Sequence, residues 1–251
     1  MSVHAVLATS GVVVVATVDT LLVLRVLRAY RVTHRTPHLV VAAGIVASFC
    51  AVVGASLVFA AEGAPELRGG WLFSLARALA FVGAALAYGL VGLFAATAYG
   101  RSRAARPLAA AMLVGLVVVA GAALALHPKE VATPATTRWA FRGPFLALSL
   151  AGSLGGWVRA RVVSRTYEAA RRTGRVVDAV VLGRMRTMAT GFLCMVIGQA
   201  AFVGYAPYGA FDTPLGLAST AVILLGALGF TLACVATWAT PAWLRAKWEA
   251  A

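Results

Sequence analysis

The sequence predicts an all-α polytopic membrane protein, a bundle of seven transmembrane helices with the N-terminus outside and the C-terminus cytoplasmic. Three observations lead to this fold class. The 251 residues are 61% hydrophobic and only 12% charged, and one soluble core could not bury so much apolar surface. The apolar residues fall into seven long runs. The basic residues gather in alternate connections between these runs.

Each apolar run is close to the roughly 20 helical residues needed to cross about 30 Å of hydrocarbon. Lipid offers no hydrogen bonds to a backbone, so each run is expected to be helical. All nine prolines fall at or beyond the expected helix ends. The expected spans are 5–27, 38–61, 72–99, 107–126, 143–160, 184–205 and 215–239.

The orientation follows from the arginines and lysines of the short connections. Seventeen of the 22 lie in residues 25–35, 101–106, 159–186 and 245–247, which are all on one side of the expected bundle. This side is predicted to be cytoplasmic. The net charge of +14 then reflects topology and requires no nucleic-acid partner. Basic connections also suit anionic membrane lipids, because each cation near the membrane surface gains about 1 kcal/mol of electrostatic attraction.

The chain is predicted to form a single domain, 1–251, with a cytoplasmic helical hairpin around 159–186 and a short amphipathic tail, 240–251. The fifth helix should continue to about Thr173, turn at Gly174, and be followed by a sixth helix from about Arg175. The cations here are expected either to face solvent and lipid headgroups or to bind a cytoplasmic or membrane protein partner. They are Arg165, Arg171, Arg172, Arg175, Arg245 and Lys247.

Three polar residues deep within the expected spans are the candidate ligand or switch residues, because such groups are costly in hydrocarbon. Asp19 could act as a proton-sensitive switch or as an internal hydrogen-bond anchor. Arg77 could bind an anionic group or extend its charge to the membrane surface. Gln199 is expected to form a hydrogen bond to another helix.

The sequence predicts no catalytic residue, cofactor or metal site. The histidines lie near helix ends or in loops, where they cannot pair to hold haem. No histidine is placed to activate a serine within the membrane, and no glycine-rich phosphate loop is present. A retinal protein would need a lysine in the middle of the last helix, and the expected span 215–239 contains none. Four outer acidic residues lack a recognised metal spacing: Glu62, Glu66, Glu130 and Asp212.

Two stretches, "YEAARRTGRVVDAVVLGRMRTMATGFLCMVIGQAAF" and "TLACVATWATPAWLRAKWEAA", resemble the last helices of the N-terminal seven-helix input modules of some bacterial sensor histidine kinases. The likeness covers about the last 90 residues. The shared features are an arginine-rich connection before the sixth helix and an exit from the seventh formed by Pro241, Trp243, Leu244, Arg245 and Trp248. The resemblance implies a sensory role and no particular ligand residue. No kinase output segment follows the exit, so we expect either a module separated from its kinase or a partner docked on the hairpin and tail.

We therefore expect a non-enzymatic sensory or signal-coupling module of the inner (plasma) membrane, which passes a ligand- or membrane-induced helix shift to a cytoplasmic partner. A transporter of small molecules or lipids is one alternative. A structural subunit of a larger membrane complex is another. The sequence leaves open the ligand, the partner and the oligomeric state.

Overall fold

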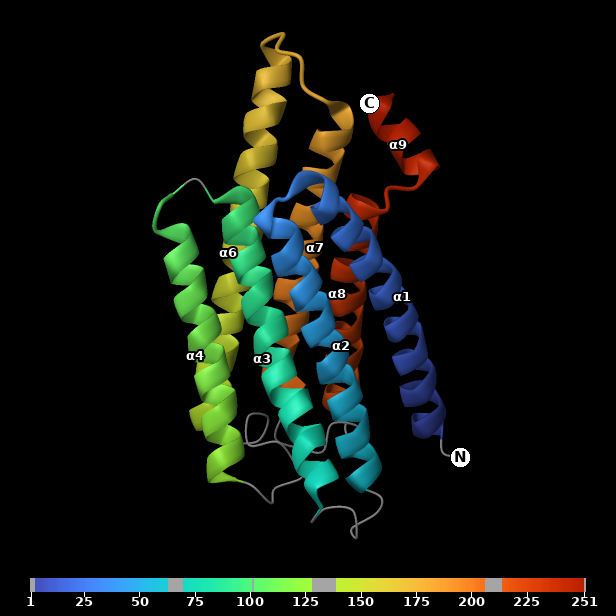
Figure 1. Cartoon of the computed structure of the whole chain (residues 1–251), viewed down its shortest axis with the longest axis vertical. Coiled ribbons are helices and arrows are strands. Elements are labelled where there is room, and N and C mark those ends of the chain that lie inside the picture. Colours follow the sequence, from blue (N-terminus) through green and yellow to red (C-terminus); the bar gives the residue numbers. More distant parts are fainter. Residues whose placement is uncertain (1–2, 63–69, 101, 128–138, 206–213, 251) are drawn as a thin grey trace. The chain divides into compact units, whose positions relative to one another are not determined.

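The computed structural model of the 251-residue chain describes residues 3–62, 70–100, 102–127, 139–205 and 214–250. These residues form helices and contain no strand (Figure 1). The prediction of an all-α protein is confirmed. The helices are α1 (Val3–Thr33), α2 (Thr36–Glu62), α3 (Trp71–Tyr99), α4 (Ala105–Leu126), α6 (Trp139–Arg172), α7 (Ala179–Tyr205), α8 (Pro214–Trp238) and α9 (Ala242–Glu249).

Five of the described helices are long and apolar enough to cross a membrane, which supports the membrane assignment. They are α2, α3, α4, α7 and α8. Helix α6 is long enough, at 34 residues, but its sequence includes many arginines and its overall hydrophobicity is low. The side chains of the first half of α1 lie outside the described residues.

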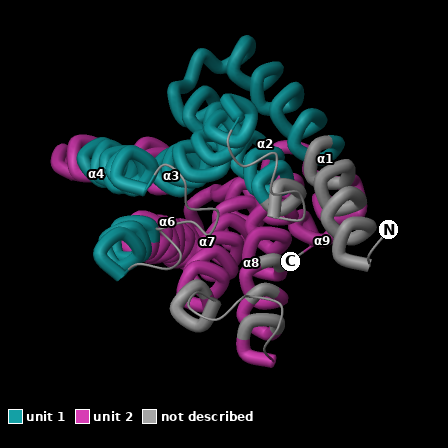
Figure 2. Tube along the Cα trace, turned by 90° about the horizontal axis from the view of Figure 1, so that it is seen from below, with its two compact units in different colours: residues 1–91, 110–149 teal, residues 92–109, 150–251 magenta. Residues whose placement is uncertain are grey.

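The chain divides into two compact units (Figure 2). Unit 1 contains residues 1–91 and 110–149, and unit 2 contains residues 92–109 and 150–251. The boundary passes through α3, α4 and α6, so each of these helices contributes a segment to both units.

Within unit 1, α1 packs on α2, and α2 and α3 approach each other through small residues. A Cβ atom added at Gly83 would lie 2.8 Å from the backbone nitrogen of Ala51, so only glycine permits this approach. Between α3 and α4 the core contains Phe81, Ala85, Leu116 and Ala120, all buried. Large and small side chains therefore alternate across this contact, as close packing requires.

Within unit 2, α7 and α8 form an extensive contact. A Cβ atom at Gly226 would lie 2.6 Å from the carbonyl oxygen of Cys194 and 2.7 Å from the Cα of Gly198. Small residues allow membrane helices to gain dispersion energy through direct backbone contact. This pairing joins two of the helices that are apolar enough to cross a membrane.

An aromatic cluster lies beside the α7–α8 contact, with Phe192 of α7 at its centre. The Phe192 ring is fully buried, and its centroid lies 6.2 Å from that of Phe94 and 5.7 Å from that of Phe230. Phe94 also contacts Trp238, with centroids 5.5 Å apart. The cluster therefore ties the last turns of α3 to both α7 and α8.

The helical hairpin differs from the prediction at one end. Helix α6 continues to Arg172 and the chain turns at Gly174, whose φ of 79° is left-handed, as expected for a glycine after a helix. Helix α7, however, begins at Ala179 and not near Arg175. The carboxylate of Asp178 caps the helix, so the preceding residues remain outside it.

Helix α6 also begins before the expected span, at Trp139, and Pro144 lies inside it. The expectation that every proline lies at or beyond a helix end is wrong at this position. Pro144 is in the second turn, where its missing N–H removes a single hydrogen bond near the start of the helix. The same extension brings Arg142 into the helix, where its side chain is buried and its Cζ lies 4.8 Å from the centre of the Trp139 ring.

Replacing Gly226 with alanine should destabilise the protein, because the new methyl group would overlap backbone atoms of α7 that cannot move independently. Overpacking of this kind typically costs about 1–3 kcal/mol. We expect a lower midpoint of thermal unfolding in detergent. Gly121→Ala in α4 is the matched control, because a Cβ there would meet nothing within 4 Å. Equal midpoints for the two variants would contradict the close contact.

Candidate functional site

The hairpin end of unit 2 is the region where α6 ends, α7 begins and α9 follows α8. The turn from α6 is held by two backbone hydrogen bonds. The N–H of Gly174 donates to the carbonyl of Arg171 at 3.1 Å, and that of Arg175 donates to the carbonyl of Ala170 at 3.0 Å. This is the Schellman arrangement, which satisfies carbonyls that have no partner within the helix. The turn is therefore a defined structure.

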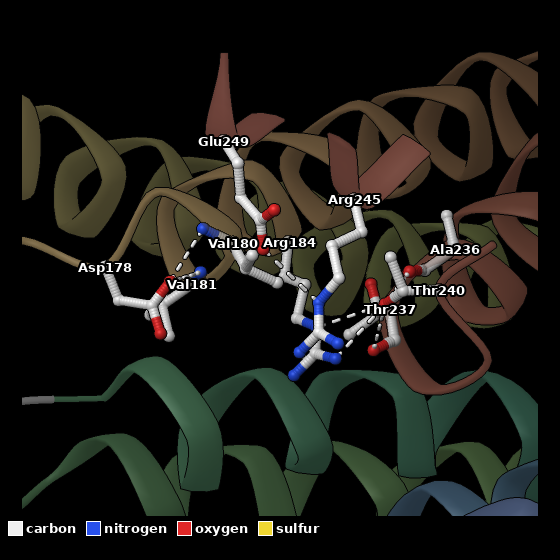
Figure 3. Close-up of polar contacts among 9 residues, drawn as sticks. All are labelled: Asp178, Val180, Val181, Arg184, Ala236, Thr237, Thr240, Arg245 and Glu249. Atoms are coloured by element: carbon white, nitrogen blue, oxygen red, sulfur yellow. Dashed lines mark hydrogen bonds and ion pairs between the residues drawn. The ribbon is translucent and has the colours of Figure 1, made fainter. Parts of the chain in front are cut away.

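Asp178 fixes the first turn of α7 (Figure 3). Its Oδ1 atom accepts hydrogen bonds from the backbone N–H groups of Val180, at 2.8 Å, and Val181, at 3.3 Å. These two N–H groups have no partner within a helix, and a negative charge at this position also interacts favourably with the helix dipole. Asp178 therefore determines where the hairpin ends and α7 starts.

Arg184, one turn further along α7, binds the connection between α8 and α9. Its Nε and Nη2 atoms both donate to Thr240 Oγ1 at 3.2 Å. The Thr240 hydroxyl donates in turn to the carbonyl of Ala236 in α8 at 2.8 Å. Figure 3 shows these bonds converging on the threonine. The start of α7 is thus linked to the end of α8 through a charged donor and a single hydroxyl.

Helix α9 also packs directly on α7. The indole ring of Trp248 lies against Gly183, and a Cβ atom at that position would overlap the ring. Pro241 precedes α9 in an extended conformation and directs the chain out of α8 into the new helix. Trp243 lies elsewhere on α9 and is 69% exposed. One tryptophan therefore attaches the tail to α7, and the other remains available at the surface.

The six cations predicted to contact a partner or lipid headgroups are all exposed. Arg165, Arg171 and Arg172 lie on α6, Arg175 lies just after the turn, and Arg245 and Lys247 lie on α9. Of these, Arg245 lies 3.5 Å from Glu249 in an exposed pair, an arrangement that contributes little to stability. Their role as partner or lipid contacts stays a prediction.

The structure gives Arg77 a partner that the sequence analysis did not identify. Its Nη2 atom donates to the backbone carbonyl of His127 at 2.7 Å, and α4 ends at the preceding residue. A cation is favoured at the carboxyl end of a helix. The Arg77 side chain is 2% exposed, so it is buried within unit 1. Its geometry is that of a helix cap.

The other two internal polar candidates are also buried. Asp19 of α1 is 8% exposed and Gln199 of α7 is 2% exposed. In the described part of the chain, neither the oxygen nor the nitrogen of the Gln199 amide has a hydrogen-bond partner. The expected bond from Gln199 to another helix is therefore not formed among these residues. Asp19 and Arg77 belong to unit 1, whereas Gln199 belongs to unit 2.

The described residues contain no group of three or more histidine, cysteine or acidic side chains that could hold a metal ion. Glu66, Glu130 and Asp212, three of the four outer acidic residues, lie outside the described residues.

Sequence reasoning missed Gly183, Arg184 and Thr240, which attach the tail. The signal available was weak, because any glycine and arginine near a helix start could serve this purpose. It also missed Ser153, a fully buried serine of α6. No family model, curated protein or solved structure matches the chain.

Gly183→Ala should release α9 from α7, because the added methyl group would occupy the position of the Trp248 ring. Hydrogen–deuterium exchange would measure this as several-fold faster exchange of the backbone amides of residues 242–250. Gly121→Ala, which makes no contact within 4 Å, should leave this exchange unchanged. If α9 exchanged at the same rate in both variants, Trp248 would not be what holds the tail.

Proposed function

We propose that the chain is a non-enzymatic sensory or signal-coupling module of the inner membrane. In this proposal seven of its helices cross the bilayer, with the N-terminus outside and the hairpin end in the cytoplasm. The five helices apolar enough to cross a membrane support this arrangement, as does the gathering of basic residues in alternate connections. Helices α1 and α6 would supply the other two crossings.

The attachment of α9 to α7 is the observation that carries the proposal. Trp248 lies on Gly183 and Arg184 binds Thr240, so α9 is linked both to the start of α7 and to the end of α8. Continuous helices transmit translations and rotations along their length. A shift of α7 against α8 within the membrane would therefore change the position of α9.

The exposed surface near this attachment is suited to an acidic protein surface or to anionic lipid headgroups. Lys247 and Trp243 of α9 are exposed, and the arginines of the hairpin extend the positive charge. A partner that contacts α9 would respond to its displacement. In this way a helix shift within the membrane would be passed to the partner.

The test is purification in native lipid followed by mass spectrometry of the proteins that accompany the chain. A signalling partner should be recovered with the unaltered chain and with Gly121→Ala, and its recovery should fall several-fold with Gly183→Ala. A partner recovered equally with all three proteins would contradict coupling through α9. Recovery of a large assembly that does not depend on α9 would favour the structural-subunit alternative.

Asp19→Asn provides a separate test of the internal switch. The substitution keeps the shape of the side chain and removes its charge, so we expect partner recovery to change while expression and thermal midpoint stay within the error of measurement. Arg77→Gln is the comparison, because it would remove the donor to the His127 carbonyl and lower stability. Parallel losses of stability and partner recovery in Asp19→Asn would assign Asp19 a structural role.

Transport of a small molecule or lipid is the second candidate. The buried amide of Gln199 has no hydrogen-bond partner among the residues that the structure describes. This favours transport, because polar groups within membrane helices commonly mark the path of a substrate.

A further inference from the structure

Two polar side chains on facing helices of unit 2 are buried. Gln199 of α7 is 2% exposed and Ser153 of α6 is fully buried. Within the described residues, the Gln199 amide atoms and the Ser153 hydroxyl oxygen all lack a hydrogen-bond partner. A buried polar group without a hydrogen bond is destabilising, so a ligand that supplies the bond would be favoured.

Other hydroxyls of these two helices are paired with their own backbone. Ser164 of α6 donates to the carbonyl of Arg161 at 3.0 Å, and Thr187 of α7 donates to that of Gly183 at 2.9 Å. Serine and threonine in helices often form such local bonds. Ser153 differs, because within the described residues its hydroxyl oxygen forms no such bond.

Ser153 of α6 and Gln199 of α7 both lie further from the turn of the hairpin than the point where the two helices meet. The two helices are joined by the short turn at Gly174, and Arg186 Nε binds Glu168 Oε1 across the hairpin at 2.8 Å. Further from the turn, a Cβ at Gly156 would lie 2.7 Å from the Phe192 ring. These two contacts show that α6 and α7 run antiparallel and face each other at Gly156 and Phe192.

Ser153 is three residues from Gly156, so the two share a face of α6. Gln199 is seven residues from Phe192, so these two share a face of α7. Ser153 and Gln199 both lie further from the hairpin, by about 4.5 Å and about 10.5 Å at 1.5 Å per residue. Their levels therefore differ by about 6 Å. Helical side chains lean toward the N-terminus of their own helix. In antiparallel helices, side chains at these two levels are therefore expected to lean toward each other.

The chemistry of these groups determines what could bind between them. The amide offers two donors and an acceptor, and the hydroxyl offers one donor and an acceptor. The nearest cation on α6, Arg159, extends back toward Gly155. That residue lies about 200° around the helix from Ser153. Neither the amide nor the hydroxyl is charged, which suits a neutral ligand.

We propose that Gln199 and Ser153 form a binding site for a neutral molecule bearing a hydroxyl group, which both donates and accepts a hydrogen bond between α6 and α7. The hydroxyl could belong to a neutral lipid or to a small free alcohol. The ligand would complete the hydrogen bonding of both side chains and would bridge the two helices of the hairpin. The site does not depend on the signalling proposal.

The experiment measures the thermal midpoint of the full chain in detergent with increasing dioctanoylglycerol, a neutral lipid with one free hydroxyl, or with millimolar glycerol. A ligand that binds the folded state raises the midpoint. We expect saturable stabilisation by one probe, with at least tenfold weaker apparent affinity in both Gln199→Leu and Ser153→Ala. A response to dioctanoylglycerol identifies a lipid source, and a response to glycerol a small alcohol.

Thr187→Val is the matched control, because its hydroxyl is already paired within α7 and its probe response should equal that of the unaltered chain. Gln199→Leu removes an amide that has no hydrogen-bond partner in the described part of the chain and changes the shape little, so the variant should fold. The proposal is overturned if neither probe gives a saturable shift. Equal apparent affinities in the unaltered chain, Gln199→Leu and Ser153→Ala would also overturn it.

Discussion

The direct backbone contact between α7 and α8 is the constraint around which unit 2 is organised. Lipid competes equally well for apolar side chains, so two membrane helices gain little by burying leucine against leucine. They gain more when glycines let the backbones approach. Gly198 and Gly226 provide this approach. The alignment of these two helices determines three further features of unit 2. They are the aromatic cluster around Phe192, the Arg184–Thr240 bonds and the contact of Trp248 with Gly183.

The two ends of this helix pair carry different chemistry. At the hairpin end, charged and aromatic side chains connect α7, α8 and α9 through bonds that are partly exposed to solvent. Further along α7, Gln199 is uncharged and buried. Polar groups in a low-dielectric environment interact strongly with a suitable partner. A change in what Gln199 contacts could therefore alter the alignment that positions α9.

The fold class and the turn at Gly174 were predictable because each follows from a local property. Length and hydrophobicity identify helices that cross a membrane, and only glycine readily adopts a φ of 79° after a helix. The start of α7 was predicted wrongly although Asp178, an N-cap residue type, stands directly before an apolar run. The helix stop at Gly174 suggests an earlier start, near Arg175. A helix stop and the next helix start need not be adjacent.

The contacts of the candidate site could not be predicted from the sequence, because they depend on register between helices. Nothing near Gly183 in the sequence indicates that Trp248 lies on it. Arg77 illustrates the same limit: its depth in α3 was predictable, but its bond to the His127 carbonyl requires knowing which helix ends beside it.

The turn between α6 and α7 has a practical consequence. Val176 is fully exposed, and the Schellman bonds and the Asp178 cap hold the two helix ends on either side of it. Insertions are best tolerated where exposed backbone separates independently secured elements. A fluorescent or epitope reporter placed beside Val176 would leave both helix ends intact, and it would reveal to which side of the membrane the hairpin projects in living cells.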